Sequence, residues 1–426
     1  MLGYLLGSLV VCFVLNVPIG FALGIATASA MIFGGTPIPL ALIPQRMVDG
    51  INSFPLLAIP FFMMAGAVME RGGVSKRIVN LSSACVGHIR GGLAAVSIVA
   101  CTFFAAISGS TPATAAAVGS LTIPEMEKRG YAKDYSAAVV AAAGCLGVII
   151  PPSITMVIFG VVANVSIGKL LIGGIVPGCI LSSLLLVTNF ICATRAGYVT
   201  EVKKTLKEAL VALKEAVWAL FMPLIILGGI MFGVFTPTES AAIAVLYGLI
   251  VGFFVYRELT LKDLIPIFYK AALNSAMIML LIAAANPFGW IVTSLQVPAM
   301  VSKALLAITT NPTGLFMLMM VLLLILGTFM ETGAILMLVV PIVAPIMQSV
   351  GVDMIHFGVL TVVALAIGMA TPPVGIALFA TCSIAHVSIG QISRKIVPFL
   401  IAFFIGLFFL VFFPAITVFL PNLMIK

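Results

Sequence analysis

The feature that most constrains this chain is a polar break inside an apolar segment without charge. Residues 91–123 contain no Asp, Glu, Lys or Arg, and Ser108-Gly109-Ser110-Thr111-Pro112 lies near their middle. Glycine and proline loosen the helical backbone there, and lipid offers no partner to the N–H and C=O groups that are freed. Such a break is tolerated where it lines a cavity or binds something. For these residues alone, a Ser/Gly-rich contact between two ordinary helices is the alternative.

The composition places this break in a membrane protein. The chain is 62% hydrophobic and 8% charged, whereas soluble domains carry about 25% charged residues. Apolar runs of about span length recur, which predicts a polytopic all-α membrane protein whose first span is retained. The net charge of +8 is concentrated in loops, which fits the positive-inside rule and argues against a nucleic-acid partner. The seven cysteines are scattered and are interpreted as packing residues.

Three further polar breaks follow, at Pro151-Pro152-Ser153, Met330-Glu331-Thr332-Gly333 and Thr371-Pro372-Pro373. Two adjacent prolines remove two N–H donors and interrupt a helix. We therefore predict two re-entrant helical hairpins and two broken helices, in the order hairpin 91–127, broken helix 135–163, hairpin 313–348 and broken helix 355–385. Between the halves, residues 195–216 are charged and place leucines at helical spacing, which predicts an amphipathic connector on the membrane surface.

The second half of the chain repeats the first at an offset of about 221 residues. Thr111 falls on Thr332, Gly147 on Gly368, and Pro151-Pro152 on Pro372-Pro373. This register predicts a first repeat at 1–200 and a second at 217–426.

Charges in matching loops indicate how the repeats are related. Residues 71–77 are basic, while their partners at 292–298 carry no charge. The loop at 125–133 holds Lys128, Arg129 and Lys133, while 346–354 holds only Asp353. Matching loops therefore lie on opposite faces, as inverted-topology repeats require. We expect residues 195–215 in the cytoplasm, both termini in the periplasm, and the hairpin tips near the midplane.

Paired breaks of this kind are typical of secondary transporters. Half-helix N-termini favour an anion, and free carbonyl oxygens favour a cation such as Na⁺. Residues 264–285 are interpreted as an apolar span, and no Lys or Arg is expected deep in any span. An anionic substrate would then be held largely by helix termini and Ser/Thr hydroxyls.

With these motifs in place, the chain resembles the large membrane subunit of TRAP (tripartite ATP-independent periplasmic) transporters over nearly its full length. The specific marks are Ser108-Gly-Ser-Thr-Pro-Ala-Thr, Pro151-Pro152-Ser153, Phe235-Thr-Pro-Thr-Glu-Ser and Gly368-Met-Ala-Thr-Pro-Pro-Val-Gly. The resemblance implies an elevator-type fold in a bacterial inner membrane, in which a domain with both hairpins slides against a scaffold. It also implies Na⁺-coupled uptake of an organic acid anion, typically a C4-dicarboxylate or a sialic acid.

The same resemblance implies partners and site residues. A small four-helix membrane subunit, expected as a separate chain, completes the scaffold, and a periplasmic substrate-binding protein delivers the substrate. No catalytic residue and no organic cofactor are implied. Two Na⁺ sites would use residues around the breaks: Ser108, Gly109, Gly147 and Pro151 in the first repeat, and Gly327, Thr332, Gly368 and Thr371 in the second. The substrate would contact small polar residues of the first repeat: Ser110, Thr111, Thr114, Ser153 and Thr155.

Several other polar residues have both a structural and a functional interpretation. Thr236-Pro237-Thr238-Glu239 has the pattern of a capping box, which we favour over a role in transport. Glu331 either caps the second hairpin or faces the cavity. Asn164 is read equally as a helix C-cap or as a ligand, and His386 is expected at the membrane interface.

The sequence has two alternative functions. An intramembrane serine protease would use Ser108 with His386, but the sequence has neither G-x-S-x-G nor H-E-x-x-H. A self-sufficient Na⁺/anion symporter of the same fold would share the residues above and would work without partner subunits.

Overall fold

The computed structural model describes residues 1–35, 38–198, 204–309 and 311–425, and within them it is helical without strands. Eight of its helices are long and apolar enough to cross a membrane. These findings confirm the predicted all-α polytopic class. The helices of the first half are α1 Leu2–Val14, α2 Ile19–Phe33, α3 Leu42–Ile51, α4 Ala58–Arg71, α5 Val74–Val86, α6 Gly92–Ser108, α7 Thr111–Lys128, α8 Lys133–Gly144, α9 Ile154–Val162, α10 Ile167–Gly173 and α11 Ile175–Ala196.

The second half follows the same order of elements at nearly the same offset. Thr332, the first residue of α17, matches Thr111 at the start of α7, and α18 starts at Met354 where α8 starts at Lys133. The helices of this half are α12 Leu206–Met231, α13 Pro237–Ile250, α14 Leu261–Ser294, α15 Val297–Ile308, α16 Pro312–Phe329, α17 Thr332–Ser349, α18 Met354–Met369, α19 Ile376–Ala385, α20 Ile389–Phe412 and α21 Ala415–Met424. Short 3₁₀ or π turns at Phe54–Leu57, Cys145–Val148 and Val251–Val255 complete them.

Each half contains one hairpin and one interrupted helix, because the predicted breaks interrupt helices. α6 and α7 pack against each other around the first break, and α16 and α17 around the second. α8 and α9 flank Pro151-Pro152, and α18 and α19 flank Pro372-Pro373. At 9 to 16 residues, these four helices are each shorter than the roughly 20 residues that span a bilayer.

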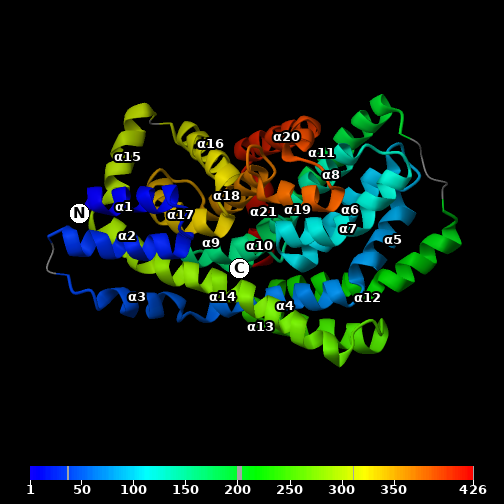
Figure 1. Cartoon of the computed structure of the whole chain (residues 1–426), viewed down its shortest axis with the longest axis horizontal. Coiled ribbons are helices and arrows are strands. Elements are labelled where there is room, and N and C mark those ends of the chain that lie inside the picture. Colours follow the sequence, from blue (N-terminus) through cyan, green and yellow to red (C-terminus); the bar gives the residue numbers. More distant parts are fainter. Residues whose placement is uncertain (36–37, 199–203, 310, 426) are drawn as a thin grey trace.

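Two groups of helices are visible in Figure 1, and they define where a site can form. α14 is 34 residues long and runs along the long axis of the molecule. It packs against α2, α3 and α4, and α4 packs against α13. The hairpins and broken helices form the other group, in which α7 and α8 pack against α19, and α8 packs against α20. α14 also contacts α17, so the second hairpin lies against this long helix.

The structure corrects several element boundaries. Two helices that belong to none of the predicted hairpins and broken helices, α3 and α5, precede the first hairpin. The apolar span predicted to end at 285 continues to Ser294 as α14.

The predicted surface helix differs as well. Residues 206–215 are the first turns of α12 and continue into the next span without a break, capped by Thr205 and Glu208. Leu206 is 77% exposed and Leu210 57%, so these leucines are not covered within this chain. Part of the connector, residues 199–203, lies outside the described residues.

Candidate functional site

The tip of the first hairpin is docked on the second half of the broken helix. α6 ends at Ser108, Gly109 has φ +63, and Ser110 is extended before α7 begins. The backbone N–H of Ile154, the first residue of α9, donates to the Gly109 carbonyl at 3.3 Å. A Cβ atom at Gly109 would lie 2.8 Å from the Pro152 carbonyl oxygen. The hairpin tip and the Pro151-Pro152 break therefore meet at backbone contact.

Gly147 lets the first part of the broken helix approach the same tip. A Cβ atom there would lie 2.5 Å from Thr114 Oγ1 and 2.6 Å from the Ser110 carbonyl oxygen. The Ser108 and Thr114 hydroxyls are hydrogen-bonded at 2.5 Å, and both side chains are buried. The sequence-predicted residues Ser108, Gly109, Gly147 and Pro151 thus come from two elements that the fold brings together.

The second hairpin shows the related arrangement. Gly327 and Gly368 face each other so closely that a Cβ atom at Gly368 would lie 2.7 Å from the Gly327 backbone. The N–H of Gly375, just before α19, donates to the Thr328 carbonyl at 3.2 Å. Thr371 donates its hydroxyl to the Ile367 carbonyl at 2.8 Å, and this bond holds its oxygen beside the break.

The groups gathered at the tips are mostly carbonyl and hydroxyl oxygens. Within the described residues, no three His, Cys, Asp or Glu side chains form a cluster suited to a transition metal. Thr111 Oγ1 is buried and lacks a hydrogen-bond partner, which is rare for a buried polar atom. Oxygen ligands of this kind suit hard cations such as Na⁺.

A cavity of about 870 Å³, here called the central cavity, lies between the two helix groups. Ser110 lines it from the first hairpin and Glu331 from the second. On the opposite side its wall is formed by α2, α4 and α14. A recess of about 90 Å³ beside it reaches Ser108 and Ile154. The hairpin tips therefore open onto one shared space.

The expectation that no Lys or Arg lies deep in a span is wrong. Lys270 is the tenth residue of α14, about 14 Å along the helix, and it lines both the central cavity and the recess. Glu70 and Asn274 lie in the same two walls. Because Lys270 is a single charge in a strongly apolar segment, the overall hydropathy of the segment concealed it. A search for isolated charges inside apolar runs would have found it.

The predicted substrate residues do not all reach the central cavity. Ser110 lines it, whereas the other four predicted residues are buried in the hairpin or the broken helix, namely Thr111, Thr114, Ser153 and Thr155. The Thr114 hydroxyl bonds to Ser108. Ser153 caps α9, accepting from the Met156 N–H at 3.2 Å and donating to the Val148 carbonyl. Thr155 is buried in the first turn of α9.

The structure also assigns the polar residues left open by the sequence. Thr236 and Glu239 form the predicted capping box of α13. Glu331 has both readings, since it accepts from the Ala334 N–H and the Thr332 hydroxyl, each at 3.1 Å, and also lines the central cavity. Asn164 directly follows the C-cap of α9 with φ +54, and exposed His386 is the C-cap of α19.

Comparisons with known proteins agree with this architecture. A solved structure, that of the Alcanivorax borkumensis YdaH transporter, matches with a TM-score of 0.65 and 16% identity, covering 88% of each chain. This likeness supports the elevator-type inverted-repeat fold.

Sequence relatives are much closer. The isethionate TRAP transporter permease protein DctMQ of Oleidesulfovibrio alaskensis is 45% identical over 98% of this chain, which spans 66% of that relative. The sialic acid TRAP transporter large permease protein SiaM of Vibrio cholerae is 39% identical over 99% of both chains. The C4-dicarboxylate TRAP transporter large permease protein DctM of Pseudomonas aeruginosa is 40% identical over 88% of both. Residues 6–416 match the family model described as "Tripartite ATP-independent periplasmic transporter, DctM component". The chain therefore belongs to the family of TRAP transporter large membrane subunits and is a transporter component, not an enzyme.

Proposed function

We propose that this chain is the Na⁺-coupled, substrate-translocating subunit of a TRAP transporter that imports a small organic acid anion by an elevator movement. The observation that carries the proposal is the docking of each hairpin tip on a broken helix around one cavity. Family membership and the apolar helices place the chain in the inner membrane as a multi-pass subunit.

Na⁺ is the proposed coupling ion because the tips supply oxygen atoms in tight backbone geometry. Ser108, Gly109, Gly147 and Pro151 would surround one ion, with Thr111 Oγ1 as an additional buried oxygen. Gly327, Thr332, Gly368 and Thr371 would surround another. The close contact between each tip and its broken helix gives a reason for coupling, since an ion held between the two would stabilise the tip in its substrate-binding form.

The substrate would lie in the central cavity between Ser110 and Lys270. The backbone N–H groups at the start of α7 favour an anion there, and Lys270 adds the full positive charge that the sequence reading lacked. Glu331 repels an anion from the second hairpin, so the substrate would sit closer to the first. The relatives' names point to three candidate classes, namely sialic acids, C4-dicarboxylates and isethionate.

The movement would carry the hairpin group past the framework of α2, α4, α13 and α14. A small membrane subunit on a separate chain would complete this framework, and a periplasmic protein would deliver the substrate. The exposed leucines of α12 are consistent with a membrane or subunit partner on that side.

The test is uptake by proteoliposomes with N-acetylneuraminate, succinate and isethionate as labelled substrates. Liposomes should contain either this chain alone or this chain with its small subunit, each with and without the binding protein. We expect uptake of one anion by the complete system alone. Equal uptake by the isolated chain would favour the self-sufficient symporter, and no uptake of any of the three would contradict the proposed substrate class.

A further inference from the structure

A second polar cavity of about 560 Å³ lies at the elbow between α4 and α5. Its wall is formed by α4, the elbow, α5, α7, Glu258 and the start of α14. We call this cavity the vestibule. It is separate from both hairpin tips, since none of the predicted Na⁺ or substrate residues lines it.

The vestibule adjoins the central cavity through a shared wall. Glu70 of α4 and Lys270 of α14 line the central cavity, its recess and the vestibule alike. Ala67 lines both the recess and the vestibule. The central cavity and the vestibule therefore meet at Glu70 and Lys270.

Ser75 is a wall residue of the vestibule whose hydroxyl lacks a hydrogen-bond partner. Ser75 lines the cavity and only 7% of the residue is exposed; its Oγ is covered by surrounding atoms and has no hydrogen-bond partner. A buried hydroxyl without a partner is costly. An anion oxygen in the vestibule would satisfy it once the Ser75 hydroxyl turns toward the cavity.

The charges around the vestibule favour an anion. Lys76 and Lys270 line it, and neither forms an ion pair in the described part of the chain. Glu258 also lines it, but its carboxylate is bound to Arg77 at 2.6 Å. Glu70 is the remaining acid, so two unpaired cations face one unpaired carboxylate.

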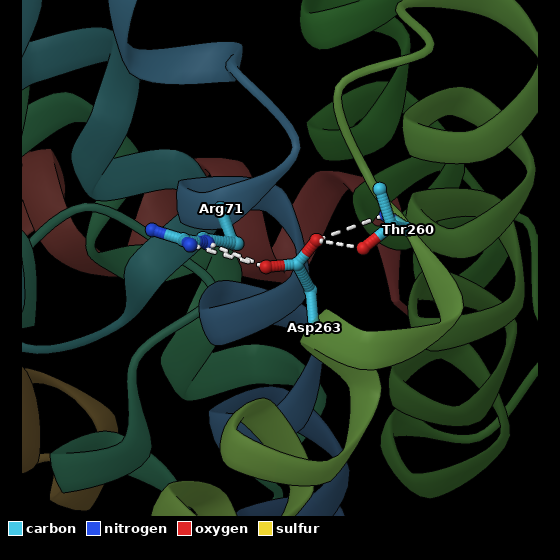
Figure 2. A network of polar contacts seen from close by, with 3 residues as sticks. All are labelled: Arg71, Thr260 and Asp263. Atoms are coloured by element: carbon cyan, nitrogen blue, oxygen red, sulfur yellow. Dashed lines mark hydrogen bonds and ion pairs between the residues drawn. The ribbon is translucent and has the colours of Figure 1, made fainter.

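An ion pair ties the two walls of the vestibule together. Figure 2 shows Arg71, at the end of α4, reaching Asp263 near the start of α14, with Thr260 on the other side of the carboxylate. Two Arg71 nitrogens donate to Asp263 Oδ1 at 3.1 Å. The Arg71 side chain is 68% exposed, so water competes for this pair and it opens readily.

We propose that the vestibule is a transient second binding site for the transported organic anion, occupied after it leaves the central cavity and before it enters the cytoplasm. Ser75 and Lys76 bind the carboxylate or sulfonate group, and the Arg71–Asp263 pair spans the outlet. This inference rests on the proposed function, which supplies the anion and the direction of movement.

The test compares substrate affinity on the two sides of the membrane. Proteoliposomes containing the complete transporter are loaded with the unlabelled anion that the wild type takes up, and labelled anion with the binding protein is added outside. The binding protein selects molecules with their periplasmic face outward. Ser75→Ala should raise the internal concentration needed for half-maximal exchange about tenfold, the effect of one lost hydrogen bond to a charged group. Lys76→Gln should raise it roughly threefold because water screens that charge.

Matched controls are available in the same chain. Ser82 is also buried and unpartnered and lies seven residues further along α5, but it does not line the vestibule. Ser82→Ala and the exposed-lysine variant Lys207→Gln should leave the internal concentration unchanged. The external half-saturating concentration should stay constant in all four variants.

Two results overturn the vestibule as a binding site. One is wild-type exchange with unchanged internal affinity in both Ser75→Ala and Lys76→Gln. The other is an equal change on both sides, which would place their effect on folding or on the central cavity. Failure of the wild type to exchange any of the three candidate anions would instead defeat the proposed function, and this result is seen before any variant is made.

Discussion

Lys270 is an expensive residue for a membrane helix. A lysine costs up to about 2.5–3.5 kcal/mol on insertion scales, the upper value applying at the centre of a span, and α14 carries Lys270 as its tenth residue, beside the central cavity. Such a charge is retained where it meets a partner or a ligand. Glu70 in the same wall is one candidate counter-charge, and the anionic group of the substrate is the other.

Replacing Lys270 should therefore weaken substrate binding while sparing Na⁺ binding. We expect Lys270→Gln to lower apparent substrate affinity by about tenfold or more, because a hydrogen bond to a charged group contributes about 1.5–3 kcal/mol. Uptake kinetics of the reconstituted complex would measure it. Lys262→Gln, near the exposed start of the same helix, is the control, and equal kinetics in both variants would remove Lys270 from the site.

Ser110 and Glu331 occupy matching positions on the two hairpins and line one cavity. Ser110→Ala should weaken substrate binding roughly tenfold, the effect of losing one hydrogen bond of about 1.4 kcal/mol. Substrate and Na⁺ affinities of Ser110→Ala and Glu331→Gln separate the two roles. If Ser110→Ala binds substrate normally and Glu331→Gln no longer binds it, the substrate site lies at the second hairpin instead.

The contact between each hairpin and its broken helix depends on glycines, because a side chain there would collide with the neighbouring backbone. Gly147→Ala would push its methyl group against Thr114 and Ser110, and we expect a loss of apparent Na⁺ affinity because the two halves of the site separate. Gly228→Ala is the control, since its methyl group would meet nothing within 4 Å. Na⁺-dependent thermal stabilisation of the purified protein measures both. Undiminished stabilisation in Gly147→Ala would show that the tip and the broken helix need not touch.

These helices also show what could be foreseen from the sequence. The first hairpin was predicted at 91–127 and its helices run from Gly92 to Lys128, because glycine and proline mark backbone breaks locally. The extent of α14 could not be read in this way. Pro287 lies inside it, and packing against other helices decides whether a helix passes through such a residue. Likewise, the meeting of the first hairpin tip with its broken helix depends on long-range contacts such as the Ile154 N–H with the Gly109 carbonyl, which no local pattern encodes.

The two halves of the chain make one prediction about orientation. Residues 71–77 and 257–263 lie side by side, since Arg71 bonds Asp263 and Arg77 bonds Glu258. The two segments therefore lie at one end of the helices, α4 and α14, that they adjoin. A reporter in the connector 195–215 should be active as a cytoplasmic enzyme, and one placed after Lys426, which lies outside the described residues, as a periplasmic one. The reverse pattern would overturn the assignment of sides.

Coupling to Na⁺ is the central claim. An ion bound between each hairpin tip and its broken helix would link ion binding to the shape of the central cavity. The most direct measurement is uptake of the identified anion by the complete reconstituted transporter as a function of external Na⁺, with choline replacing it. We expect a dependence steeper than linear, with Thr371→Val shifting half-maximal uptake to higher Na⁺ because one candidate oxygen is lost. Undiminished uptake in choline buffer, driven by a proton gradient, would contradict the account.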